Sequence, residues 1–158
     1  MKIGIISDSH DHMKELKQVM EKLKDCEALI HCGDACAPFV HKELGNFNGP
    51  VHIVVGNNEG EQFHMMRVKP DNVTIYKPLA ELEIAGKKIA ITHYKDFADP
   101  LALTGKYDVV FYGHTHKKDS HKVNETLVLN PGDLMNLHGE RGYAIYDTDT
   151  GEATQYDF

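Results

Sequence analysis

The alternation of short apolar segments with helical ones over the first 55 residues constrains the fold most. Lys2–Ser7, Ala28–Cys32 and Val51–Val55 have the length and the branched apolar side chains of buried strands. The segments between them, Asp11–Lys24 and Pro38–Leu44, are expected to be helices. A βαβαβ order favours a parallel sheet with right-handed crossovers.

The rest of the chain is richer in strands. Short helices are expected at Glu61–Arg67 and Pro100–Gly105, and hairpin turns at Ala85–Lys87 and Asp149–Gly151. This pattern fits a two-layer β-sandwich with helices outside. The strands expected here are Val73–Tyr76, Glu81–Ile84, Lys88–Thr92, Val109–Tyr112, Thr126–Leu129, Tyr143–Tyr146 and Ala153–Tyr156.

Length and composition are those of one soluble domain, which we expect to span residues 1–158. A chain with 41% hydrophobic and 26% charged residues can bury a core without disulfides. No apolar stretch reaches the length of a signal-peptide core or a membrane span. Three cysteines, an odd count, argue against a disulfide framework and predict a reducing, cytoplasmic compartment.

The net charge of −7 limits the classes of partner. Generic nucleic-acid binding usually requires a basic patch, and the sequence contains no run of basic residues. A small phosphate-ester substrate is compatible with this charge, because bound cations can attract a phosphate locally. A homo-oligomer is left open.

Polar residues with metal-binding side chains follow five of the expected strands, in a chain with 11 histidines. In open α/β sheets, ligands bind at the carboxyl ends of strands, so these side chains are expected to meet at one rim. A mixed nitrogen and oxygen set suits Mn, Fe, Ni, Co or Zn. The candidate ligands are Asp8, His10, Asp34, Asn57, His93, His114 and His116.

The two-residue spacing within two pairs of candidate ligands has a physical explanation. In an extended chain, Asp8 and His10 project to the same side and can hold one cation together. His114 and His116 have the same spacing, but in a turn they can diverge and serve different metals. The glycines before Asp34, Asn57 and His114 permit tight turns.

These motifs resemble those of the calcineurin-like metallophosphoesterase superfamily. The short length, and Asn130-Pro131-Gly132, resemble its small prokaryotic phosphodiesterase branch. The resemblance implies a four-layer αββα sandwich, an α/β fold of two mixed sheets flanked by helices. The motifs that carry it are Asp8-Ser9-His10, Gly33-Asp34, Gly56-Asn57, His93 and Gly113-His114-Thr115-His116.

The resemblance also implies two divalent metals about 3.5–4 Å apart and hydrolysis of a phosphate ester by a metal-bridging water or hydroxide. Asp34 would bridge the metals. The residues implied for the first metal are Asp8, His10, Asp34 and His116, and those for the second are Asp34, Asn57, His93 and His114. Those implied in catalysis are Asp34, Asn57, His93 and Asn58.

One departure concerns the leaving group. Many phosphatases of the superfamily have a histidine directly after the motif asparagine, where it can protonate the leaving group. Asn58 stands there in this chain, followed by Glu59. An amide can donate a hydrogen bond but is no general acid, and His12 and His64 are the candidate replacements.

Other interpretations stay open at this stage. Asp8 alone could cap a helix, Asn57 alone could stabilise a turn, and His93 alone could be a core histidine. The whole fold could serve as a non-catalytic protein-binding scaffold, or as a metal sensor without turnover. A degraded scaffold site should have lost histidines that this chain retains. The histidines that fit no ligand position are His31, His41, His52, His121 and His138.

Overall fold

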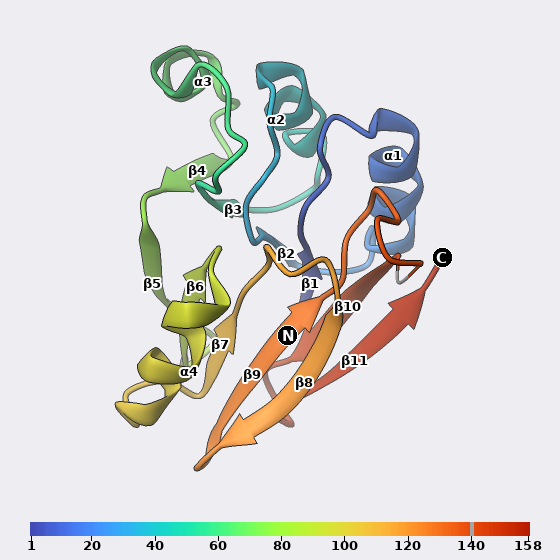
Figure 1. The fold of residues 1–158 in the computed structure, drawn as a ribbon. Coiled ribbons are helices and arrows are strands. Elements are labelled where there is room, and N and C mark those ends of the chain that lie inside the picture. Colours follow the sequence, from blue (N-terminus) through green and yellow to red (C-terminus); the bar gives the residue numbers. More distant parts are fainter. Residues whose placement is uncertain (140) are drawn as a thin grey trace.

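The computed structural model describes residues 1–139 and 141–158. Two mixed β-sheets pack face to face between helices, as Figure 1 shows. The helices are α1 (Met13–Lys22), α2 (Pro38–Leu44), α3 (Gln62–Val68) and α4 (Lys95–Leu103). The strands are β1 (Lys2–Ile6), β2 (Ala28–His31), β3 (Val51–Val54), β4 (Val73–Tyr76), β5 (Leu79–Ile84), β6 (Lys87–Thr92), β7 (Val109–Phe111), β8 (Lys118–Val123), β9 (Thr126–Pro131), β10 (Gly142–Asp147) and β11 (Glu152–Asp157).

Both sheets are mixed: the first is antiparallel at one edge and the second at both. The first sheet has the order β11-β10-β1-β2-β3-β4, in which β1, β2 and β3 run parallel as the βαβαβ pattern predicts, and β4 is also parallel to β3. The second has the order β5-β6-β7-β9-β8, with β6, β7 and β9 parallel. The expected αββα sandwich of two mixed sheets is therefore confirmed.

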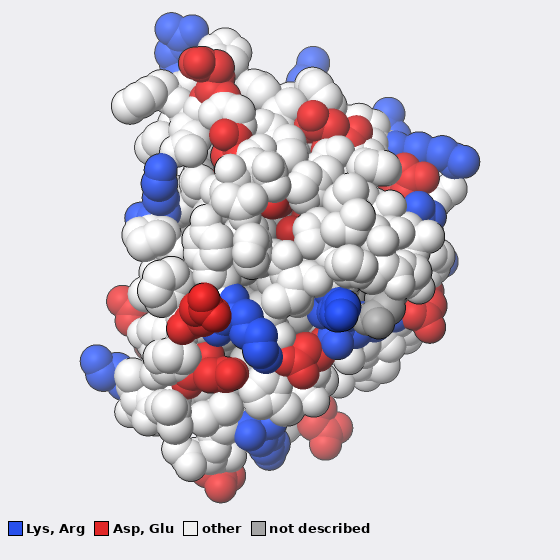
Figure 2. All heavy atoms as spheres, in the orientation of Figure 1, with Lys and Arg blue, Asp and Glu red and all other residues white. Residues whose placement is uncertain are grey.

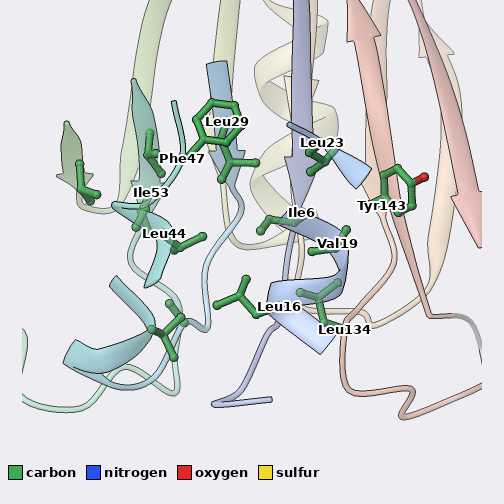
Figure 3. Close-up of a cluster of buried hydrophobic side chains, with 14 of the residues drawn as sticks. Ile6, Leu16, Val19, Leu23, Leu29, Leu44, Phe47, Ile53, Leu134 and Tyr143 are labelled. Carbon is green, nitrogen blue, oxygen red and sulfur yellow. The ribbon is translucent and has the colours of Figure 1, made fainter. Parts of the chain in front are cut away.

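Apolar side chains separate the four layers. Alternate residues of β1 serve two of these interfaces, because Ile3 and Ile5 face the second sheet while Ile6 faces the helices. The helical side, drawn in Figure 3, includes Leu16 of α1 and Leu23, directly after this helix, packed against the first sheet. On the outer face of the second sheet, α4 packs through small buried alanines.

Two elements differ from the sequence-based expectation. The helix expected at Pro100–Gly105 begins earlier, at Lys95, and Pro100 lies inside it. Pro100 has no N–H, so it cannot donate the helical hydrogen bond to the carbonyl four residues earlier. Strand β8 was not expected, because its polar sequence lacks apolar alternation; it is an edge strand that pairs with β9.

Among the described residues, no helix is both long and apolar enough to cross a membrane.

Candidate metal centre

Loops from both sheets meet at the carboxyl ends of β1, β2, β3, β6 and β7. Backbone hydrogen bonds connect them, from the amide of Asp8 to the Gly33 carbonyl (3.0 Å) and from Gly113 to the His93 carbonyl (3.1 Å). Figure 2 shows acidic side-chain atoms in the middle of this face, with uncharged residues around them. The two backbone bonds each join loops of the same sheet. Contacts between the two sheets bring the loops together into the predicted rim, from Nδ1 of His93 to the Cys32 carbonyl (2.8 Å) and from the His114 amide to Oδ2 of Asp8 (3.0 Å).

Five candidate ligands have left-handed backbone conformations. Asp8, His10, Asp34, His114 and His116 have φ angles of 50°, 41°, 58°, 67° and 56°. Non-glycine residues pay of order 1–3 kcal/mol for such a conformation, and these conformations cluster at functional sites. Each of these turns redirects the chain at the end of its strand.

Two glycines allow the loops to approach closely. Gly33 has a φ of 103°, and a Cβ there would lie 2.5 Å from Nδ1 of His93. A Cβ on Gly113 would collide with the side chains of Ser7 and Asp8. The glycines that the sequence suggested for tight turns therefore also permit contact between loops.

The first cluster consists of Asp8, His10 and His116. Oδ1 of Asp8 lies 3.9 Å from Nε2 of His10 and 3.5 Å from Nε2 of His116. The other oxygen of Asp8 accepts hydrogen bonds from the Ser7 hydroxyl and the His114 amide. Oδ1 of Asp8 and Nε2 of His10 are buried with no hydrogen-bond partner among the described residues. Buried polar atoms normally have partners, and a cation between these two would supply one.

The second cluster consists of Asp34, His93 and Asn57. Nδ1 of His93 lies 2.8 Å from the Cys32 carbonyl, which can only accept, so Nδ1 carries a proton. Nε2 is directed toward Oδ1 of Asn57 at 3.0 Å and Oδ2 of Asp34 at 3.5 Å. Three potential ligand atoms therefore converge here as well.

Asp34 connects the two clusters. Its Oδ2 lies 3.4 Å from Nε2 of His10 and 3.5 Å from Nε2 of His93. Burial alone raises the pKa of Asp34, but the neighbouring His93 and the hydrogen bonds from Asn58 hold it well below its ordinary value. The pKa of His10 is raised, chiefly by the neighbouring Asp8 carboxylate. The two carboxylates thus concentrate negative charge at this site and favour cations, so the residues present fit a divalent metal centre.

A sequence profile described as the calcineurin-like phosphoesterase superfamily domain matches residues 1–151. The chain belongs to this superfamily. Superfamily membership implies divalent metal ions, which the donor atoms described above suit.

Within the superfamily, the chain resembles proteins named as phosphodiesterases. It is 37% identical over 159 residues to phosphodiesterase MJ0936 of Methanocaldococcus jannaschii, an alignment that covers 96% of each chain. The solved structure of an archaeal phosphodiesterase matches with a TM-score of 0.92 at 36% identity, over 100% of both chains. Vps29 of Entamoeba histolytica matches with a TM-score of 0.72 over 100% of this chain and 99% of that one. Its identity is 16%, which indicates a shared fold alone.

Asp133 is a supporting residue that the sequence reasoning missed. This buried carboxylate lies 2.8 Å from Nδ1 of His116 and also accepts hydrogen bonds from the amides of Asn136 and Leu137. A carboxylate in this position fixes the proton on Nδ1 and leaves Nε2 free to face Asp8. Its one sequence signal is its place directly after Asn130-Pro131-Gly132.

Asn130 and His31 hold the loops in place. The amide of Asn130 donates to the Gly113 carbonyl (2.9 Å) and to the Thr115 hydroxyl (3.0 Å), within the loop that carries His114 and His116. His31 accepts from the Gly33 amide (3.2 Å) and pairs with the Ser9 hydroxyl (3.0 Å). Burial lowers the pKa of His31 to about 3, so it stays neutral.

The residues after Asn57 contact the second loop. Asn58 donates to both oxygens of Asp34, from its backbone and its side-chain amide, each at 2.8 Å. Glu59 accepts from the amides of Ala35 (3.1 Å) and Cys36 (2.8 Å). Asn58 thus orients the shared carboxylate, while Glu59 ties the loop after β3 to the loop after β2.

The remaining histidines differ in how close they lie to the two ligand clusters. The His114 ring is exposed and lies 5.1 Å from that of His93, at the edge of the two clusters. His138, which the sequence placed outside the site, lies with its ring 6.4 Å from that of His116. His12 faces Glu15, and among the described residues neither it nor His64 has a side-chain hydrogen bond, ion pair or ring contact with a candidate ligand.

Proposed function

We propose that this protein is a two-metal phosphodiesterase that hydrolyses small phosphate diesters. The observation that carries the proposal is the position of Asp34, whose Oδ2 lies 3.4 Å and 3.5 Å from histidines of two different clusters. One carboxylate oxygen between two histidines is suited to bridge two cations. We assign Asp8, His10, Asp34 and His116 to one cation and Asp34, Asn57, His93 and His114 to the other.

The donor chemistry narrows the metals to Mn, Fe, Ni, Co or Zn, because imidazole nitrogens and carboxylate oxygens are mixed. The phosphodiesterase name of a relative that is 37% identical supports diesters as the substrate class. A net charge of −7 favours small substrates over nucleic acids. The proposal includes a cytoplasmic location, which the free thiols of Cys26, Cys32 and Cys36 support.

When bound, two such cations acidify a water for attack on phosphorus and neutralise charge on the phosphoryl oxygens. The chain's own contribution is orientation. Asn58 fixes Asp34, the Cys32 carbonyl fixes the ring of His93, and Asp133 fixes the ring of His116. Because the side chain of Asn58 donates to Asp34 and cannot release a proton, the leaving group departs without an acid at this position.

Reconstitution of the metal-stripped protein tests the proposal. The protein is loaded in turn with Mn, Ni, Co, Zn or Mg and given bis(4-nitrophenyl) phosphate and 4-nitrophenyl phosphate. We expect metal-dependent hydrolysis, faster for the diester. His116→Gln should remove it, whereas the matched change His64→Gln, on exposed α3, should not. A protein that binds two metals yet hydrolyses neither ester would instead be a scaffold or a sensor.

A further inference from the structure

Two aromatic side chains continue the surface of the proposed metal centre outward. Tyr94 directly follows His93, and its ring lies 5.0 Å from that of His93 and 5.1 Å from that of His114, edge-on to both. Phe97, in the first turn of α4, lies with its ring 6.0 Å from that of Tyr94, at an interplanar angle of 81°. We call Tyr94 and Phe97 the aromatic ledge.

Packing of α4 does not account for the exposure of Phe97. The helix contacts the second sheet through Ala98 and Ala102, both fully buried, while Phe97 is 55% exposed. A single exposed apolar residue is ordinary on a protein surface, and Phe63 on α3 is 89% exposed. Phe97 differs from Phe63 in its contact with a ring that touches two proposed ligands.

The charges around the aromatic ledge disfavour a second anionic group. Lys95 is the neighbouring cation, but its Nζ is bound to Asp119 (3.0 Å) and to the Tyr112 hydroxyl (3.3 Å). Asp96, next to Phe97 in the chain, is exposed. A further phosphate would meet carboxylates here, whereas an uncharged planar group would meet an aromatic face.

We infer that the aromatic ledge binds a neutral planar aromatic substituent of the phosphate ester, such as an aryl group or a nucleobase. Phe97 is then a specificity-determining residue. The inference rests on the proposed function, because the ledge acts on whatever ester the metals hold. Aromatic pairs of this kind typically contribute about 3–10-fold in affinity beyond buried area, and bases stack on exposed aromatic side chains in the same way.

Competitive inhibition of the metal-loaded enzyme tests the inference. Hydrolysis of methyl 4-nitrophenyl phosphate is the reporter, and phenyl phosphate and methyl phosphate are the inhibitors. Each inhibitor has one substituent, so the ratio of their inhibition constants measures the aryl contribution alone. We expect the wild type to favour phenyl phosphate, and Phe97→Ala to reduce that preference about 3–10-fold while methyl phosphate binds as before.

Phe97→Tyr should keep the preference, and Phe63→Ala, which removes an equally large exposed ring elsewhere, should leave it unchanged. An unaltered ratio in Phe97→Ala, or an equal loss for both inhibitors, would overturn the inference while the proposed function stands. Absence of reporter hydrolysis by the wild type with every metal would overturn both.

Discussion

Replacement of Asp34 by asparagine should weaken metal binding while the fold is retained. Asp34 is buried and its Oδ2 faces both His10 and His93, so Asp34→Asn removes charge from both proposed cation positions at once. The amide keeps an oxygen that can accept from the backbone of Asn58. The core strands make no use of this side chain, so the fold should persist.

The expected magnitude follows from linkage between binding and folding. A metal at about 100 times its Kd stabilises the folded state by about 2.7 kcal/mol. For a chain of this size about 1 kcal/mol raises Tm by about 2–4 °C, so the metal should raise it by about 5–11 °C. Loss of an outer-shell partner already weakens metal binding about 10–100-fold, and a bridging ligand should matter at least as much. At about 100-fold weaker affinity the same metal concentration gives about 0.4 kcal/mol, or about 1–2 °C.

Thermal unfolding with and without Mn, beside elemental analysis of bound metal and diesterase activity, measures all three consequences. Turnover should fall by several orders of magnitude. Asp149→Asn makes the same charge change at an exposed acid beside the N-terminus and should keep the full metal-induced shift. If Asp34→Asn retains two metals and full activity, the bridging role is wrong.

Three further predictions concern other residues. His41 is buried and both its ring nitrogens lack partners among the described residues, so His41→Leu should stabilise the protein by about 1–2 kcal/mol in urea unfolding at pH 7. Burial lowers the pKa of His41 to about 4; the unfolded chain therefore binds more protons below about pH 6.5, and stability falls from there toward pH 4. His41→Leu should flatten that decline, and an unchanged acid slope would contradict the assignment. Asp133→Asn should weaken metal binding about 10–100-fold in a metal titration, because it releases the ring of His116; unchanged affinity would refute this support. With Asn58 unable to act as an acid, kcat/KM for aryl diesters should fall steeply as leaving-group pKa rises. A flat series with rate-limiting chemistry would point to another acid, and His138→Ala would test one candidate, whose ring lies 6.4 Å from that of His116.

The sequence predicted the fold best where burial is two-sided. Strands β1, β2 and β3 are covered on both faces, so they read as continuous apolar runs and their bounds were nearly correct. Strand β8 lies at a sheet edge with alternate residues exposed, and its polar sequence has no such signal. The start of α4 was placed too late because proline usually marks the first turn of a helix, whereas Pro100 is inside it.

The candidate site was predictable to the extent that it depends on strand order. Residues directly after parallel strands must lie at one rim, and the structure brings six of the seven candidate ligands into two clusters there. The contribution of Asp133 depends on a hydrogen bond to His116 across two loops, which no local pattern encodes. The same holds for His138, whose approach to His116 depends on how residues 135–139 fold, and for Asn58, which is directed at Asp34.

Three features of the metal centre destabilise the folded loops without a cation, and the binding of a cation would offset all of them. Asp8 and Asp34 have left-handed backbone, their carboxylates lie close together, and Oδ1 of Asp8 has no hydrogen-bond partner among the described residues. The contacts that oppose these costs are hydrogen bonds to backbone groups, made by Glu59, His31 and Asn130, and they hold the loops in position. Such bonds keep the ligands preorganised, so a cation that binds need not first order the chain. Because cation binding satisfies the lone pairs and the charge together, stability and metal affinity should rise and fall in parallel across variants of the ligands. Phe97→Ala, which removes a ring that contacts Tyr94 and, among the described residues, no candidate ligand directly, should change substrate preference without changing either.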